Sequence, residues 1–313
     1  MIVQQSNLLL FFDLHIVYMG GDILQIRGID ISEWQGKLSL EDFKKIKDSN
    51  IDFIMIRCGY TTYGKSKTKK KDPYFENNYT LAKQLGIPVG TYYYSCATTI
   101  LEGVSEAKFV LDIIHDKQFE YPIAIDTEDN HDIENANYAK ESQASIGKQA
   151  LTPVIQAFCD TLEQENYYVS IYASTSWFRN RLILTDLTEY DKWIAQWSST
   201  VSFSEKYGMW QYSSKGSVDG ISGNVDLDYA YKDYPAIMKN VGLNGYVKND
   251  ENSNDNNDSG KGEEDNNGDD SSSNTDSDEN VICFKKIFQF IYDFIRKIGK
   301  ALMSLFKNTN SKK

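Results

Sequence analysis

The sequence predicts an α/β fold, built either as a closed β/α barrel or as a doubly wound sheet. From about residue 27 to residue 240, β-branched and aromatic runs alternate with helical patterns, which is typical of repeated strand–helix units. Most of these runs are continuously apolar, as expected for a parallel sheet buried on both faces. No Gly-x-Gly-x-x-Gly follows the first run, which weakens the nucleotide-binding form of the doubly wound sheet.

The expected elements follow one another along the chain. Ser39 or Asp42 is placed to cap the first helix, and Gly86 followed by Pro88 would end the second. The second half has fewer clear helices, so a barrel formed by this chain is expected to be irregular. Strands are predicted at Arg27–Ile31, Ile51–Cys58, Pro88–Ser95, Pro122–Thr127, Tyr168–Ala173, Lys192–Trp197, Gly208–Tyr212 and Val225–Tyr229. Helices are predicted at Leu40–Ser49, Phe75–Gly86, Ile100–Asp116 and Leu151–Asn166.

Composition excludes several classes of function. At 313 residues and 41% hydrophobic content, the chain can bury a large core. Its net charge is −12 and its main body has no basic face, so no nucleic-acid partner is expected. With three histidines and no Gly-rich phosphate loop, we expect neither a metal site nor a cofactor. The four cysteines lack Cys-x-x-Cys spacing and are expected to be reduced: Cys58, Cys96, Cys159 and Cys283.

Residues 1–26 form an N-terminal extension without an assigned role. The apolar run Leu8–Phe12 has no preceding Lys or Arg and is followed by Asp13, unlike a secretory signal. It is also too short to span a bilayer. We therefore expect a protein made in the cytoplasm without a clear signal peptide, whose translation starts at Met1 or Met19. A packed N-terminal strand is the alternative interpretation of this segment.

The composition changes twice towards the C-terminus. Residues 248–280 contain twelve Asp and Glu, two Lys and no apolar residue, which predicts a disordered acidic linker. In residues 281–313, apolar side chains recur at helical spacing among eight Lys and Arg, which predicts a cationic amphipathic helix. Three roles stay open for this helix: binding to an anionic membrane or wall surface, self-association through its heptad spacing, or docking on the folded body.

Four acidic residues stand at the ends of predicted strands: Asp30, Asp126, Glu128 and Asp226. Buried unpaired charge is costly, so carboxylates at the ends of apolar runs are usually paired, exposed or functional. In an α/β barrel, catalytic side chains project from the carboxyl ends of the strands. The set therefore indicates an acidic cleft.

Asp126 and Glu128 are the sharpest part of this pattern. Residues at i and i+2 of a strand point to the same face, so both carboxylates would enter one cleft as neighbours. Crowded like charges raise one pKa, which leaves a protonated acid beside an ionised partner. Glycosidic cleavage needs this division, because one group protonates the leaving oxygen while another stabilises positive charge at the ring carbon. A solvated acidic loop is the alternative interpretation. It is disfavoured because Asp30 and Asp226 also stand at the ends of predicted strands.

The segment Asp30-Ile-Ser-Glu-Trp-Gln-Gly36 resembles the glycoside hydrolase family 25 lysozymes, the Chalaropsis-type muramidases of phages and Gram-positive bacteria. The resemblance runs from about Gly28 to Tyr231. Further motifs follow in order at Asp52–Arg57, Gly86–Tyr92, Ile125–Glu128, Ser170–Tyr172, Trp193–Ala195, Trp210–Tyr212 and Gly220–Asp226.

The resemblance implies an irregular TIM-like β/α barrel over residues 27–247 that cleaves the β-1,4 bond between N-acetylmuramic acid and N-acetylglucosamine in peptidoglycan. It implies that Glu128 is the general acid and that Asp126 orients the substrate N-acetyl group or stabilises charge on it. The N-acetyl group is the expected nucleophile, and retention and inversion of configuration are both left open. Asp30 and Asp226 would complete the acidic floor. Such an endolysin or autolysin acts on the cell wall after release or secretion by another route. Aromatic side chains expected to contact sugar, or else to pack in the core, are Tyr92, Tyr172, Trp197 and Trp210.

Two features depart from the family pattern. Tyr93 stands where many members carry a histidine. The segment Tyr60–Asp72 contains five lysines and is expected to be a solvated loop, or else a site that attracts anionic wall polymers. Two other functions are the alternatives: a non-catalytic wall-binding module with a membrane-active C-terminal helix, and a chitinase-like glycosidase. The four carboxylates disfavour the first, and the absence of an Asp-x-x-Asp-x-Asp-x-Glu strand disfavours the second.

Overall fold

The computed structural model describes residues 18–248, apart from 20–21, 24, 65 and 129–141. The chain divides into two units, residues 1–253 and 254–313, and every described residue belongs to the first. The predicted cationic helix over 281–313 lies outside the described residues, as does the predicted acidic linker over 248–280 apart from its first residue.

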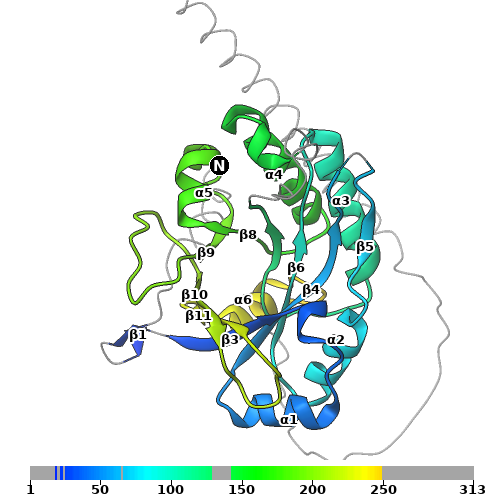
Figure 1. Ribbon diagram of the computed structural model, residues 1–313, viewed down its shortest axis with the longest axis vertical. Coiled ribbons are helices and arrows are strands. Elements are labelled where there is room, and N and C mark those ends of the chain that lie inside the picture. Colours follow the sequence, from blue (N-terminus) through cyan, green and yellow to red (C-terminus); the bar gives the residue numbers. More distant parts are fainter. Residues whose placement is uncertain (1–17, 20–21, 24, 65, 129–141, 249–313) are drawn as a thin grey trace, which may run out of the picture. The chain divides into compact units, whose positions relative to one another are not determined.

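Within these described residues, nine strands form one sheet, and eight of them close into a barrel, so the prediction of a barrel is confirmed and the doubly wound sheet is excluded (Figure 1). Around the ring the order is β3, β11, β10, β9, β8, β7, β6 and β4, and pairing of β3 with β4 completes the closure. The barrel strands are β3 (Ile26–Ile31), β4 (Phe53–Thr61), β6 (Val89–Tyr94), β7 (Ile123–Asp126), β8 (Val169–Ser174), β9 (Asp191–Ala195), β10 (Met209–Gly216) and β11 (Val225–Ala230).

The barrel is irregular at its last strand. The expectation of a parallel sheet is wrong at β11, which is antiparallel to both β10 and β3. An antiparallel strand begins at the edge of the sheet where its parallel neighbours end. Asp226, near the start of β11, therefore lies directly opposite Asp30, near the end of β3. This reversal brings a carboxylate from the far end of the domain to the same rim as the others.

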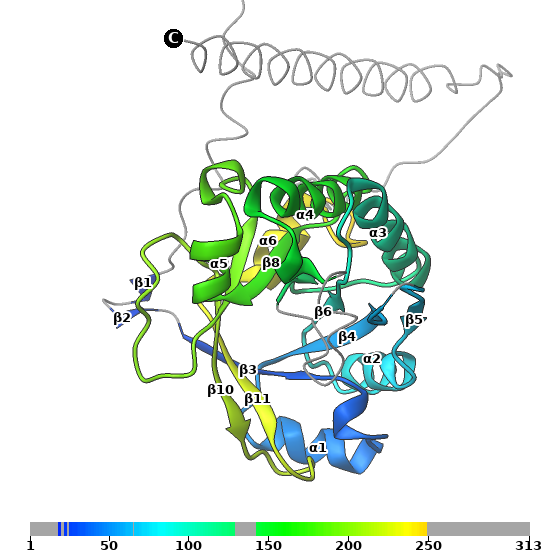
Figure 2. The same cartoon turned by 45° about the horizontal axis from the view of Figure 1, so that its top comes forward.

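In the described part of the chain, helices α1 to α5 lie on the outside of the strands (Figures 1 and 2). The predicted cap of the first helix is confirmed, because Ser39 Oγ accepts from Asp42 N at 3.2 Å and Asp42 Oδ2 accepts from Ser39 N at 2.9 Å. The fourth helix begins three residues before the predicted start, after Gly147. The five are α1 (Leu40–Asp48), α2 (Phe75–Gln84), α3 (Ile100–Ile114), α4 (Lys148–Glu163) and α5 (Thr175–Arg181).

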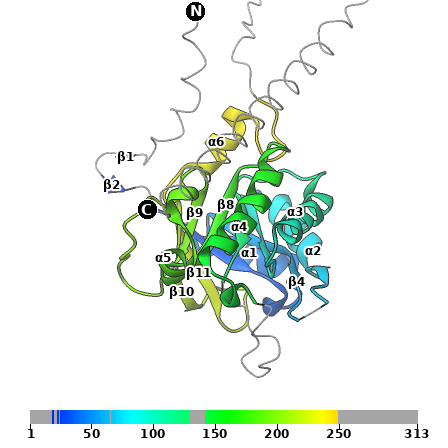
Figure 3. The same cartoon turned by 90° about the horizontal axis from the view of Figure 1, so that it is seen from above.

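Alternating side chains of the strands separate two buried layers. Outward-facing residues such as Ile54, Ile125 and Ile171 belong to the apolar core that also contains buried residues of the outer helices. Inward-facing residues such as Phe53 and Trp193 form a second core with α6 (Tyr234–Val241), which closes one end of the barrel (Figure 3). At the other end, the open end of the barrel, inward-facing positions are polar, as at Asp30 on β3 and Asp126 on β7.

The lysine-rich segment Tyr60–Asp72 is not simply a solvated loop. Residues Lys69–Lys71 form β5, which pairs antiparallel with β4. Lys67 Nζ lies 2.7 Å from Glu102 Oε2, and Lys69 Nζ donates to Ser105 Oγ at 2.6 Å, so two of the lysines are held against α3. Their charge is therefore partly engaged inside the molecule.

Several smaller predictions also meet the structure. Tyr18–Met19 (β1) and Asp22–Ile23 (β2) form a short antiparallel pair in the predicted N-terminal extension. The three cysteines within the described residues are free and buried: Cys58, Cys96 and Cys159. Within the same residues, no helix combines the length and apolarity that crossing a bilayer requires.

Candidate active site

The four predicted carboxylates come together at the open end of the barrel. Asp30 lies near the end of β3 and Asp126 is the last residue of β7, and each is only 5% exposed. Glu128 follows β7 by two residues and is half-buried, as is Asp226 on β11. The charge of Asp226 acts on Asp30, and the charges of Glu128 and Asp30 act on Asp126, so the carboxyl groups share one site.

The pKa values of three of these carboxyl groups are raised. Burial raises the pKa of Asp30 well above its ordinary range, and the charge of Asp226 adds to the effect. Burial, with the charge of Glu128, likewise raises the pKa of Asp126. Burial raises the pKa of Asp226 to about 6. The site therefore retains protons at a pH where isolated carboxyl groups are ionised, as acid catalysis requires.

One carboxylate oxygen of Asp126 is available to accept a hydrogen bond from a ligand. Its Oδ1 is buried and has no hydrogen-bond partner among the residues that the structure describes. Buried polar atoms are normally satisfied, and exceptions need an explanation. A substrate group that donates a hydrogen bond would satisfy this oxygen.

Asp228 is a fifth carboxyl group that the sequence-based prediction missed. It is fully buried, and its Oδ1 accepts from Trp193 Nε1 at 2.8 Å. Its Oδ2 has no donor within the described part of the chain, and the carboxyl group lies against that of Asp30. Burial, with the charge of Asp30, raises the pKa of Asp228 well above its usual range. The sequence contains a pattern that indicates Asp228, because Asp226 and Asp228 have the same i, i+2 spacing as Asp126 and Glu128.

Gln211 connects two of the predicted aromatic residues to the carboxylates. Its Nε2 donates to Asp30 Oδ2 at 2.8 Å. Its Oε1 accepts from Tyr172 Oη at 2.9 Å and from Trp197 Nε1 at 3.0 Å. The indole of Trp197 is nevertheless 64% exposed, so its ring faces the open side of the site. Tyr172 and Trp197 therefore lie beside the carboxylate cluster.

The other two predicted aromatic residues differ in position. The Tyr92 side chain lies in the barrel, where its hydroxyl donates to Asp30. The structure does not bring Trp210 to the carboxylates. Its Nε1 donates to the Gln196 carbonyl at 2.8 Å, and its ring packs against Tyr229 in the outer core. Strand alternation explains this, because Gln211 points inward and its neighbour must point outward.

Arg57 and two exposed aromatic rings complete the rim. Arg57 is buried, with Nη2 donating to Glu33 Oε1 at 2.7 Å and Nε donating to Asp72 Oδ2 at 2.9 Å. Trp34, after β3, is 81% exposed, and Tyr63, after β4, is 47% exposed. Across the described ranges, no group of three or more His, Cys, Asp or Glu side chains is arranged to hold a metal ion. The arrangement suits acid–base chemistry on a polar ligand with flat, partly apolar faces.

Comparisons with known proteins agree with this geometry. The family model for glycosyl hydrolases family 25 matches residues 29–221. The autolytic lysozyme of Clostridium acetobutylicum is 28% identical over 206 residues, covering 65% of this chain and 55% of that protein. The modular autolysin LytC of Streptococcus pneumoniae matches with a TM-score of 0.58 and 27% identity, over 67% of this chain and 47% of that one. A LytC structure in complex with a synthetic peptidoglycan ligand matches with a TM-score of 0.58 and 26% identity, over the same shares of the two chains. The chain thus spans about half the length of these relatives.

Proposed function

Because the chain belongs to glycosyl hydrolases family 25, we propose that it is a muramidase, which cleaves the β-1,4 bond between N-acetylmuramic acid and N-acetylglucosamine in peptidoglycan. The observation that carries the proposal is the meeting of Asp30, Asp126, Glu128 and Asp226 at the open end of a barrel whose other end is closed by α6. The similarity to LytC, which has been crystallised with a synthetic peptidoglycan ligand, supports the choice of substrate.

In this mechanism Glu128 protonates the glycosidic oxygen as the bond to the ring carbon breaks. Glu128 lies two residues beyond the end of β7 and is more exposed than Asp126. This position suits a group that must reach the leaving oxygen. Their charges interact, so the pair favours holding one proton over losing both. General acid catalysis of this kind contributes roughly 10²–10⁴-fold to a rate.

Asp126 acts on the acetamido group of the sugar at the cleavage point. The unpartnered Oδ1 accepts a hydrogen bond from the acetamido N–H, while the acetamido carbonyl oxygen attacks the ring carbon. Water then opens the cyclic intermediate and gives its proton to the Glu128 carboxylate. Two displacements at one carbon retain the configuration, so NMR of the first product anomer tests this substrate-assisted route.

Aromatic faces at the rim are assigned to sugar binding. Trp197, Trp34 and Tyr63 are exposed at the open end, and amphipathic rings of this kind pack well against sugar faces. Tyr172 and Tyr92 act deeper in the cleft, where their hydroxyls bind Gln211 and Asp30.

The test compares wild-type protein with Glu128→Gln on purified Gram-positive cell walls, following both turbidity and new reducing ends. We expect wild type to clear walls, and Glu128→Gln to bind them equally well but to lose at least about 100-fold in rate. Glu120→Gln is the matched control, because Glu120 accepts from Tyr246 and from Val89 N near the starts of β6 and β7, away from the open end. Equal release of reducing ends by wild type and Glu128→Gln would refute the assignment of the acid.

A further inference from the structure

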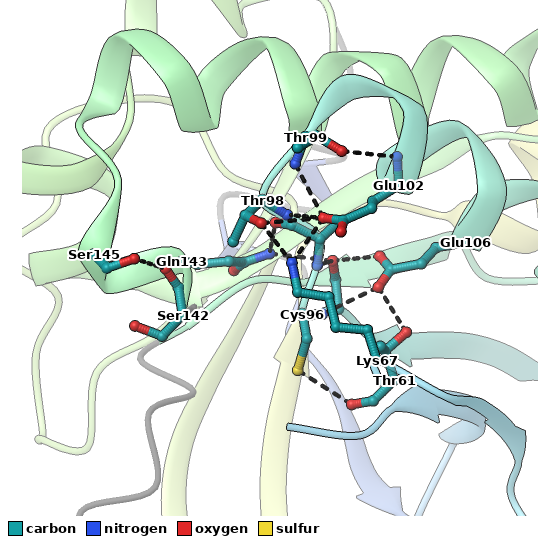
Figure 4. Close-up of polar contacts among 12 residues, drawn as sticks. Thr61, Lys67, Cys96, Thr98, Thr99, Glu102, Glu106, Ser142, Gln143 and Ser145 are labelled. Carbon is teal, nitrogen blue, oxygen red and sulfur yellow. Dashed lines mark hydrogen bonds and ion pairs between the residues drawn. The ribbon is translucent and has the colours of Figure 1, made fainter. Parts of the chain in front are cut away.

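A buried polar chain begins at the end of the strand that carries the proposed catalytic pair, and Figure 4 shows the part of it around Gln143 and Glu106. Thr127 lies between Asp126 and Glu128 and is fully buried. Its Oγ1 donates to Gln143 Oε1 at 2.8 Å and accepts from Trp177 Nε1 at 3.2 Å. The residue between the two carboxylates is thus held from outside the cleft.

Gln143 joins Thr127 to the end of β6. Its Nε2 donates to Ser95 Oγ at 3.1 Å and to the Ala97 carbonyl at 3.1 Å. Because Ala97 offers only an acceptor here, the amide nitrogen must face β6 and the amide oxygen must face Thr127. The orientation of Gln143 is therefore determined by its partners.

Glu106 on α3 is the acceptor at which the chain ends. Ser95 Oγ donates to its Oε2 at 2.5 Å, while Thr61 Oγ1 at 2.6 Å and Cys96 N at 3.2 Å donate to its Oε1. The side chain is buried, and Figure 4 shows it directed at these partners. Each donor from Trp177 onward consequently points along the chain towards Glu106.

The family departure at Tyr93 belongs to the same network. Tyr93 Oη lies 2.8 Å from Thr61 Oγ1, whose own proton goes to Glu106. The phenol therefore donates to Thr61 and adds a further donor that is oriented towards the carboxylate. The network draws on the ends of β4, β6 and β7 and on helices α3 and α5.

We propose that the chain from Glu106 through Ser95 and Gln143 to Thr127 positions Asp126 and Glu128 for catalysis. Glu106, Gln143 and Thr127 are positioning residues, since none of them faces the cleft. The inference rests on the proposed function of the carboxylate pair. Displacement of catalytic groups by about 1 Å can cost on the order of 100-fold in rate, so a rigid support outside the cleft has a direct catalytic effect.

The test uses two substitutions that differ in one hydroxyl group. Thr127→Val keeps the shape of the side chain and removes the hydroxyl, whereas Thr127→Ser keeps the hydroxyl. We expect Thr127→Val to lower kcat on cell walls by about ten-fold or more with KM changed less than about two-fold, and Thr127→Ser to restore most of kcat. Glu106→Gln should lower kcat in the same way, while Glu120→Gln should leave it unchanged. All variants are assayed well below their melting temperatures, so that lost activity does not reflect unfolding.

Two outcomes would overturn the proposal. One is a Thr127→Val protein with wild-type kcat, and the other is an equal loss of kcat in the Val and Ser variants. Glu128→Gln is measured in parallel. If Glu128→Gln is inactive while Thr127→Val matches wild type, only the positioning role fails. If Glu128→Gln keeps wild-type activity, the proposed function fails and the positioning role falls with it.

Discussion

Replacing Glu106 with glutamine should change how folding stability depends on pH. Burial raises the pKa of Glu106 from 4.5 to about 7, even though three donors oppose the shift. The folded protein therefore binds this proton more tightly than the unfolded chain does. Stability contributed by the protonated group is fully present below pH 4.5 and is lost as pH rises through about 7.

The size of the effect follows from the two pKa values. Each pKa unit corresponds to about 1.4 kcal/mol, so ionising Glu106 in the folded state costs ~3 kcal/mol more than in the unfolded chain. Glutamine does not ionise. The free energy of unfolding of Glu106→Gln, minus that of wild type, should rise by ~3 kcal/mol between pH 4.5 and pH 8. Lost hydrogen bonds shift this difference by a constant amount and do not alter its slope.

Urea unfolding at several pH values measures the difference. Glu120→Gln is the control with the opposite sign. Burial alone would raise the pKa of Glu120, but bonds from Lys83, Tyr246 and Val89 N prevail and lower it, so its contribution is lost as pH falls. A Glu106→Gln difference that stays constant from pH 4.5 to pH 8 would refute the reasoning, because it would mean that Glu106 does not titrate in this window.

Three further substitutions test the cleft itself. Asp226→Asn should lower the pKa of Asp30, because the charge of Asp226 helps to raise that pKa. NMR titration of the Asp30 carboxyl carbon measures the change, and an unchanged titration would contradict the proximity of the two groups. Asp228→Asn should raise the melting temperature at pH 7 by roughly a few degrees, since it removes a buried acid with an unpartnered oxygen and supplies a donor to Asp30. A lower melting temperature measured by calorimetry would contradict this expectation. Trp197→Ala should weaken binding to cell walls several-fold in co-sedimentation, while the free energy of unfolding changes by about 0.5 kcal/mol or less, because the ring is largely exposed; unaltered binding would remove Trp197 from the sugar site.

The strand pattern predicted most of the barrel because its strands are buried on both faces. Continuous apolar runs such as Phe53–Met55 mark such strands without any knowledge of their partners. The direction of β11 could not be predicted in this way, since an antiparallel strand buried in the same ring has the same composition. The short strand Lys69–Lys71 was missed because its pairing with β4 uses backbone groups, while its lysine side chains resemble those of a solvated loop.

Some residues of the site can be predicted from local sequence pattern, whereas others depend on tertiary contacts. The placement of Asp126 follows from strand spacing alone. Strand alternation, applied to Gln211 and Trp210, would also have shown that only one of the two can face the cleft. Hydrogen-bond partners from distant parts of the chain cannot be predicted in this way. No sequence pattern indicates that Gln143 and Glu106 support Thr127, because those contacts exist only when the ends of β4, β6 and β7 meet.

The most direct test of the central claim is the identity of the sugar at the new chain ends. Cell walls digested by the wild-type protein are reduced with borohydride, hydrolysed, and analysed for reduced amino sugars. Cleavage at the proposed bond leaves N-acetylmuramic acid at the reducing end, so muramicitol should accumulate with digestion, and Glu128→Gln should produce none. Accumulation of glucosaminitol instead would show that the other glycosidic bond is cut and would contradict the account.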